Sequence, residues 1–290
     1  MSRARLALVL VLGIAGCPAK RPEEKKAEPA RRLAIAKLEV IDRTAPEERL
    51  PGVSDASLLA LVRGRLVASP VVELVTAPRA GAYQLRVEVG VAFRQEEEGG
   101  EVRRVVLGSA RAHVPGTSEA VELEASSVTP LPRGDGKRDK AGVERVVGQL
   151  VEDLLFQASL AVAPEEKLAA ALAEKDATRL AAAVEIAAVR RVRACVPHLI
   201  KLLRHKDLRV SDRAIGALVA VGDQRAVKPL TRLVDLRDTA HLAKVLDAIG
   251  DLGGQEARDY LEFVASGHED ADIRNLAAEA LERLKRREKK

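Results

Sequence analysis

Apolar and polar residues follow two different periods in the first half of the chain. In residues 82–93, AYQLRVEVGVAF, every second side chain is apolar, and this alternation predicts a half-buried β-strand. Its predicted inward face consists of Tyr83, Leu85, Val87, Val89, Val91 and Phe93. Residues 54–69 place apolar side chains one helical turn apart behind Ser54, which predicts a helix capped by that serine. The inward face of this helix consists of Leu58, Val62 and Leu66.

Other segments complete a small domain over residues 33–162. We expect further strands at residues 33–42, 71–75, 102–114 (after a turn at 96–101) and 120–128. The polar residues 131–140 predict a loop. Residues 141–162 predict a long helix whose apolar stripe is Val143, Val147, Leu150, Leu154 and Phe156 or Ala158. This order of elements is typical of an α/β or α+β domain.

Residues 163–290 are repetitive. Asp176, Asp207 and Asp238 are spaced by 31 residues, and Asp270 follows 32 residues later. Leucines recur with the same period at 168, 199, 230 and 261. Each period reads as two helices; in the clearest one these are residues 210–221 and 225–234. A fixed period of this kind predicts an all-α solenoid of stacked helix pairs.

Two resemblances accompany these patterns. Residues 213–234, RAIGALVAVGDQRAVKPLTRLV, resemble the short HEAT-like repeats of phycobilisome-lyase relatives, although the period is shorter than the usual HEAT period of about 40 residues. This resemblance implies a HEAT-like α-solenoid that binds a protein. Residues 33–42, 61–75 and 82–89 are similar in pattern to domains of the Tol translocation beta-propeller protein, curli-secretion lipoproteins and lipoproteins that activate peptidoglycan synthases.

The N-terminus has the layout of an export signal. Arg3 and Arg5 precede an apolar run at residues 6–16 that is too short to cross a bilayer core of about 30 Å. The run ends in a segment that resembles a bacterial lipobox: Ile14, Ala15, Gly16 and Cys17. The resemblance implies that residues 1–17 are a signal peptide and that the Cys17 thiol carries lipid. The alternative is an ordinary signal peptide with an incidental cysteine.

The lipobox resemblance also implies a location. Pro18, and not aspartate, follows the cysteine, which favours the outer membrane, facing the periplasm. Residues 18–32 lack apolar periodicity and contain three prolines, so we expect a disordered tether between the lipid and the folded chain.

The net charge of +5 does not indicate a nucleic-acid partner, because it lies in the tails. Residues 1–17 carry +2, residues 18–32 carry +3 and residues 282–290 carry +4, which leaves −4 for the rest of the chain. Aromatic residues make up 2% of the chain, so stacking platforms for single strands are not evident.

Candidate chemistry is sparse, and we expect no enzyme activity, catalytic residue, cofactor or metal. His198 and His205 are seven residues apart on one predicted helix, too far apart to bind one metal without other ligands. His268-Glu269 is a single pair, whereas the di-iron HEAT enzyme deoxyhypusine hydroxylase uses several such pairs. Cys195 holds the repeat position of Ala226 and Ala257, as a packing residue would. The motif GDGK at 134–137 lacks the P-loop spacing.

Basic side chains on two predicted second helices are the candidate binding residues: Lys201, Arg204, Lys228 and Arg232. They predict a ridge for an acidic protein, with an ordinary solvated helix face as the alternative. The sequence as a whole predicts a lipid-anchored scaffold that binds another protein of the cell envelope. The alternative function is an envelope assembly or regulatory factor, in peptidoglycan synthesis or secretion, that acts through residues 33–162.

Overall fold

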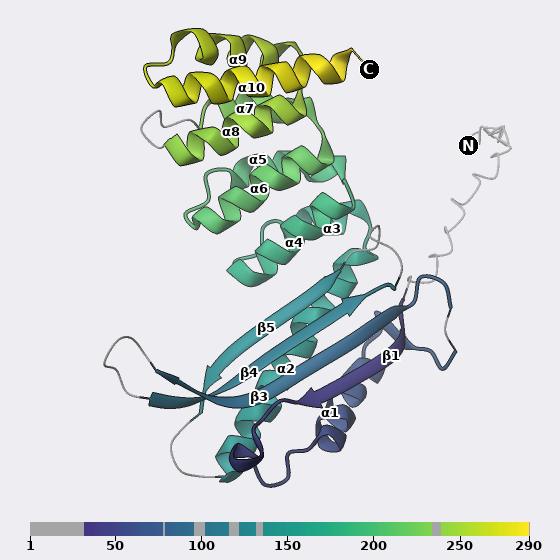
Figure 1. Ribbon diagram of the computed structural model, residues 1–290. Coiled ribbons are helices and arrows are strands. Elements are labelled where there is room, and N and C mark those ends of the chain that lie inside the picture. Colours follow the sequence, from purple (N-terminus) through teal and green to yellow (C-terminus); the bar gives the residue numbers. More distant parts are fainter. Residues whose placement is uncertain are drawn as a thin grey trace, which may run out of the picture. The chain divides into compact units, whose positions relative to one another are not determined.

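A five-stranded mixed sheet forms the first part of the fold (Figure 1). The computed structural model describes residues 32–77, 79–95, 102–115, 122–131, 136–233 and 239–289. The strands are β1 (Leu33–Asp42), β2 (Val72–Leu74), β3 (Tyr83–Gln95), β4 (Val102–His113) and β5 (Leu123–Pro130). Their order across the sheet is β2-β1-β3-β4-β5, in which β1 is parallel to β2 and β3, whereas β4 is antiparallel to β3 and β5.

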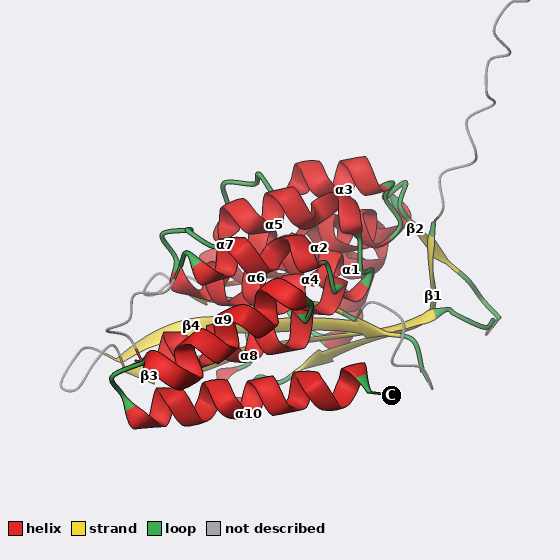
Figure 2. Ribbon diagram, turned by 90° about the horizontal axis from the view of Figure 1, so that it is seen from above, coloured by secondary structure: helices red, strands yellow, loops and turns green. Residues whose placement is uncertain are grey.

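Two helices cover one face of this sheet, α1 (Asp55–Val67) and α2 (Gly136–Ala161) (Figure 2). A short 3₁₀ turn, η1 (Pro46–Glu48), precedes α1. Ser54 caps α1 in a reciprocal arrangement with Ser57, as its position in the sequence predicts. The predicted inward faces are confirmed for the described side chains: those of α1 and those of β3 from Tyr83 to Val91 are buried. The turn at 96–101 lies outside the described residues.

The loop predicted at residues 131–140 is partly wrong, because α2 already begins at Gly136. Asp139 in its first turn is buried, and Nη1 of Arg104 lies 2.9 Å from its Oδ2. A carboxylate near a helix N-terminus is favourable, and the arginine of β4 compensates its charge. The polar residues 136–140, which by themselves predict a loop, therefore begin a helix that a tertiary ion pair stabilises.

Stacked helices form the second part of the fold, which confirms the predicted fold class (Figure 1). They are α3 (Glu165–Ala171), α4 (Ala177–Val189), α5 (Val196–Leu202), α6 (Leu208–Val221), α7 (Val227–Thr231), α8 (Thr239–Leu252), α9 (Gln255–Gly267) and α10 (Ala271–Glu288). The 3₁₀ turns η2 (Arg193–Cys195) and η3 (Gln224–Ala226) lead into α5 and α7. The helix predicted at 225–234 is thus a 3₁₀ turn followed by the shorter α7.

The period of 31 residues has a structural cause. Asp176, Asp207 and Asp270 are the N-caps of α4, α6 and α10, and each side chain accepts a backbone N–H bond from the first turn. Asp238 lies outside the described residues. The four periodic leucines lie on α3, α5, α7 and α9 and are each 0% exposed. The period therefore reflects two recurring positions, an N-cap aspartate and a buried leucine.

The sheet and the stacked helices share one hydrophobic core, which runs from Leu33 to Leu284. Helix α2 packs against the sheet and also against α4. Arg190, at the end of α4, donates a hydrogen bond of 2.7 Å to the carbonyl of Leu160 in α2. No helix among the described residues is both long and apolar enough to cross a membrane.

Candidate functional site

The predicted basic residues lie on or directly after two second helices of the stack, and we call them the basic ridge. Lys201 is in the last turn of α5, and Arg204 follows that helix. Lys228 is in α7, and Arg232 directly follows α7 as its C-cap. All four side chains belong to exposed residues. None of them forms an ion pair with another described residue. The ridge therefore presents positive charge that its surroundings in the described chain do not neutralise directly.

Some other charged side chains of the helical stack are paired within the chain, whereas others, such as Arg213, have no ion pair with a described residue. Arg209 contacts Asp207 at 3.0 Å, and Lys244 of α8 contacts Asp212 of α6 at 2.6 Å. Arg225 binds Asp223 at 2.6 Å, and this hydrogen-bonded guanidinium holds the pKa of Asp223 below its usual value. Such pairs reduce the local charge, whereas the ridge side chains keep a charge that no described residue neutralises directly.

Phe263 extends the same row by one repeat and is not among the binding residues predicted from the sequence. The residue stands 31 positions after Arg232, just as Arg232 stands 31 after Lys201. It lies on α9 and is 72% exposed, which is unusual for a phenylalanine. The period that related the two basic residues also identifies this position. An exposed aromatic side chain next to a charged row is a typical anchor for a protein contact.

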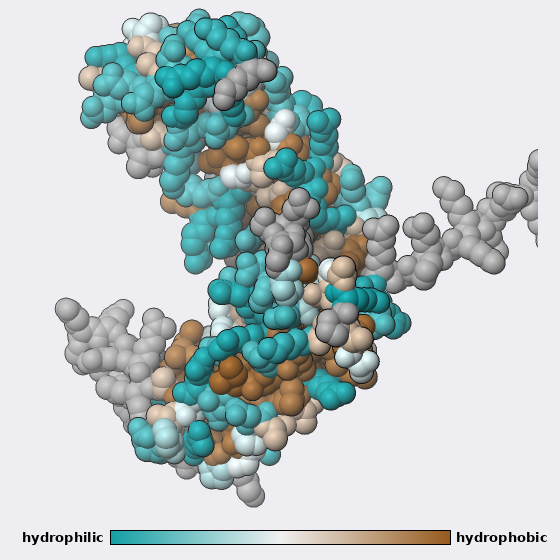
Figure 3. Space-filling model, turned by 45° about the vertical axis from the view of Figure 1, so that its right-hand side comes forward, coloured by the Kyte–Doolittle hydropathy of each residue, from teal (hydrophilic) through white to brown (hydrophobic). Residues whose placement is uncertain are grey.

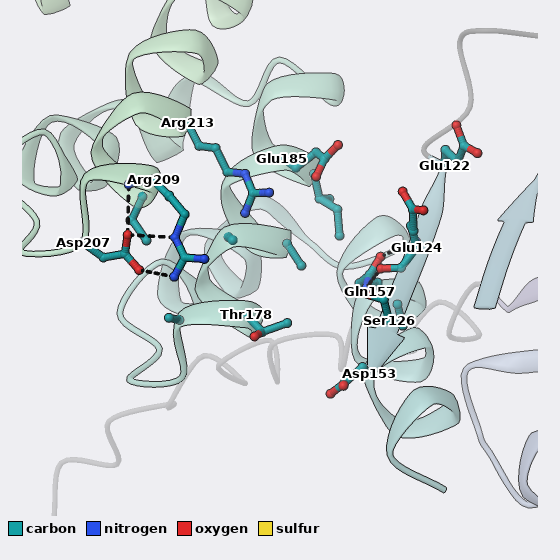
Figure 4. Close-up of a pocket in the computed structure, with 16 residues that line it drawn as sticks. Glu122, Glu124, Ser126, Asp153, Gln157, Thr178, Glu185, Asp207, Arg209 and Arg213 are labelled. Atoms are coloured by element: carbon teal, nitrogen blue, oxygen red, sulfur yellow. Dashed lines mark hydrogen bonds and ion pairs between the residues drawn. The ribbon is translucent and has the colours of Figure 1, made fainter. Parts of the chain in front are cut away.

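A second candidate site is a groove between the sheet and the stack, with a volume of about 420 Å³ (Figure 4). We call it the sheet–helix groove. One wall comes from β5 and α2, and the other comes from α4 and the N-terminal part of α6. Its labelled polar lining residues are Glu122, Glu124, Ser126, Asp153, Gln157, Thr178, Glu185, Asp207, Arg209 and Arg213. Because they come from four elements, no local pattern in the sequence brings them together.

Carboxylates outnumber guanidinium groups five to two in the groove lining. Two of them, Glu122 and Glu124, bind Arg111 of β4 at 3.3 and 2.8 Å, and Glu124 above all raises the pKa of that arginine. The Arg209 side chain donates to Asp207 and lowers its pKa, so this aspartate stays ionised. Asp153 lies 3.7 Å from Arg179, so among the described residues Glu185 is the lining carboxylate without an ion pair. Five carboxylates against four arginines, with Arg111 and Arg179 counted beside Arg209 and Arg213, leave the groove a net charge of −1.

Two histidines and the cysteine of the stack contribute to the structure of the fold itself. His205 and His268 stand two residues before the N-caps Asp207 and Asp270, and each Nδ1 accepts the N–H of its aspartate at 3.1 Å. Cys195 is 0% exposed, like its repeat equivalents, and burial raises the pKa of its thiol to about 11. Among the described residues, no three His, Cys, Asp or Glu side chains lie close enough to hold a metal ion.

Comparison with known families supports the interpretation of the helical stack. A family model for HEAT repeats matches residues 165–242, from the start of α3 into α8. The predicted resemblance to HEAT-like repeats is therefore confirmed for this part of the chain. No curated protein matches the chain. HEAT repeats serve in general as scaffolds for protein–protein interaction, which makes an interaction surface the expected kind of functional site here.

Proposed function

We propose that this protein is a non-enzymatic, lipid-anchored adaptor of the bacterial cell envelope that binds an acidic protein through its basic ridge. The observation that carries the proposal is the exposed positive charge of Lys201, Arg204, Lys228 and Arg232 on the HEAT-repeat stack, where none of the four forms an ion pair with another described residue. Exposed charge of one sign speeds the encounter with a partner of opposite charge and makes binding sensitive to salt. Phe263 supplies the apolar contact that a purely electrostatic surface lacks.

The anchoring part of the proposal rests on the sequence of the N-terminus. The lipobox resemblance at residues 14–17 makes Cys17 the site of lipid attachment, and each buried CH₂ of an acyl chain contributes about 0.8 kcal/mol. Several chains would hold the protein permanently on the membrane. A tether of residues 18–32 would reach roughly 20 Å as a coil, so that the ridge could meet a partner away from the lipid surface.

Charge reversal tests the ridge. The variant Lys228→Glu/Arg232→Glu should lose a partner that is crosslinked to the wild-type protein in whole cells and recovered with it. The matched control is Arg63→Glu/Arg145→Glu, which changes the net charge equally at exposed positions of α1 and α2. Equal recovery of the partner by both variants would refute the ridge. In the same assay, Cys17→Ala should release the protein from membranes without loss of the partner.

The open face of the sheet favours the second function, an assembly or regulatory factor acting through residues 33–162. Leu107 and Val128 lie side by side on this face and are 40% and 50% exposed. Figure 3 shows hydrophobic surface gathered on the sheet part of the chain. Leu107→Ser should impair envelope assembly while recovery of the ridge partner is unchanged. An assembly defect of the ridge variant alone would exclude this function.

A further inference from the structure

Strand β5 forms one edge of the sheet, and part of that edge has no backbone partner among the residues that the structure describes. In an antiparallel pair, successive residues turn their N–H and C=O groups alternately toward and away from the neighbouring strand. The N–H of Leu131 donates to the carbonyl of Arg104 at 2.8 Å, which places the odd-numbered residues on the β4 side. The backbone groups of Glu124, Ser126 and Val128 therefore face away from the sheet. Those of Ser126 and Val128 have no hydrogen-bond partner among the described residues.

At the start of this edge, a side chain forms the two hydrogen bonds that a further strand would form with the backbone. Oε1 of Gln157 accepts the N–H of Glu124 at 3.0 Å, and its Nε2 donates to the carbonyl of Glu124 at 2.7 Å. Gln157 belongs to α2 and is buried. At the other end, Pro130 has no N–H to offer. The unpaired edge is thus limited to Ser126 and Val128, between an amide that satisfies one end and a proline that closes the other.

The edge of β5 is reached from two hollows in the surface. Ser126 lines the sheet–helix groove and also a hollow of about 320 Å³ on the open face of the sheet, so the edge is accessible from both sides. Helices α4 and α6 form the opposite wall of the groove. A single peptide strand needs only about 4.8 Å beside β5.

We propose that the edge of β5 binds an extended, basic segment of a partner protein, which adds a sixth strand to the sheet. The backbone of this segment forms hydrogen bonds with the backbone groups of Ser126 and Val128. These bonds give affinity without a preference for the sequence of the segment. Its basic side chains meet the net negative charge of the groove, chiefly at Glu185, which has no ion pair among the described residues. This site is independent of the basic ridge and prefers the opposite charge, so the chain can hold two different segments at once.

A synthetic octapeptide of alternating lysine and valine serves as the probe. In the free protein, the amide hydrogens of Ser126 and Val128 should exchange with solvent much faster than those of Ser127 and Thr129, which face β4. Saturating peptide should slow exchange at Ser126 and Val128 by at least tenfold, measured by NMR. Protection that appears elsewhere, or equally over the whole surface, would mean that the peptide binds by charge alone and would overturn the proposal.

Backbone methylation of the peptide separates strand addition from electrostatics without altering the protein. One peptide carries N-methyl groups on alternate residues and a second carries them on the intervening residues. Only the peptide whose methyl groups face β5 should lose at least tenfold in affinity. Equal affinities for both peptides would overturn the proposal. The protein variant Ser126→Pro, checked for an unchanged thermal transition, should weaken the unmethylated peptide to the same extent, while reversal of Lys228 and Arg232 should not.

Discussion

Replacing Arg191 with glycine should stabilise the fold. Arg191 follows α4 with a φ of 50°, in the left-handed region. Gly222 and Gly253 stand 31 and 62 residues later, at the equivalent positions, with φ of 71° and 70°. The backbone at Arg191 closes its helix as a left-handed C-terminal cap does, because the N–H of Val192 donates to the carbonyl of Ala187 at 3.2 Å. The first repeat thus keeps an arginine where the next two have glycine.

The size of the effect follows from two opposing contributions. A left-handed conformation costs a residue with a Cβ about 1–2 kcal/mol. Glycine removes this strain but adds freedom to the unfolded chain, which offsets about 0.4–1 kcal/mol. The Arg191 side chain is exposed and forms no ion pair with a described residue, so its loss should cost little. We therefore expect Arg191→Gly to raise the free energy of unfolding by about 0.5–1 kcal/mol.

Equilibrium urea unfolding, followed by circular dichroism, measures this difference. Arg191→Ala is the matched control, because it removes the same side chain but keeps the Cβ and hence the strain. The glycine variant should shift the midpoint upward at constant slope, and the alanine variant should stay near wild type. If both variants lowered the midpoint equally, the arginine side chain itself would stabilise the fold, and the reasoning from backbone strain would be wrong.

Two further predictions concern titratable groups. The lowered pKa of Asp207 contributes stability above the pKa of an unfolded aspartate, about 4, and that stability is lost as the pH falls through the lower folded value. Asp207→Asn, which keeps the cap, should therefore lose less stability than wild type between about pH 5 and pH 2; parallel losses would contradict this. In a Cys17→Ala background, iodoacetamide should not modify Cys195 at pH 8 until the protein unfolds, because burial raises the thiol pKa to about 11; rapid labelling of the folded protein would contradict this.

The elements of this fold could be predicted because their signals are local. Alternation in β3, the cap at Ser54 and the 31-residue spacing of the aspartates each act within one element or one repeat. The start of α2 could not be predicted, because the burial of Asp139 depends on Arg104, 35 residues earlier in the chain. The local polarity of these residues predicts a loop, whereas the ion pair with a distant arginine stabilises a helix.

The candidate sites also differ in whether a local pattern in the sequence can identify them. The basic ridge and Phe263 follow the repeat period, so a single spacing identifies them once the helices are known. The sheet–helix groove depends on how β5, α2, α4 and α6 pack together, and its lining extends from Glu122 to Arg213. The open edge at Ser126 and Val128 is a matter of strand order, and order across a sheet leaves no mark on a single strand's sequence.

The packing of α2 against α4 has a consequence for where repeats can be gained or lost in this fold. Each repeat of a solenoid contacts only its neighbours, so whole repeats can be gained or lost without disturbing the others. Here α2 occupies the N-terminal end of the stack and the polar α10 closes the opposite end. Insertion or loss of a repeat between α7 and α10 would lengthen or shorten the ridge side of the molecule. The groove, built on α4 and α6, would keep its dimensions in relatives with any number of repeats.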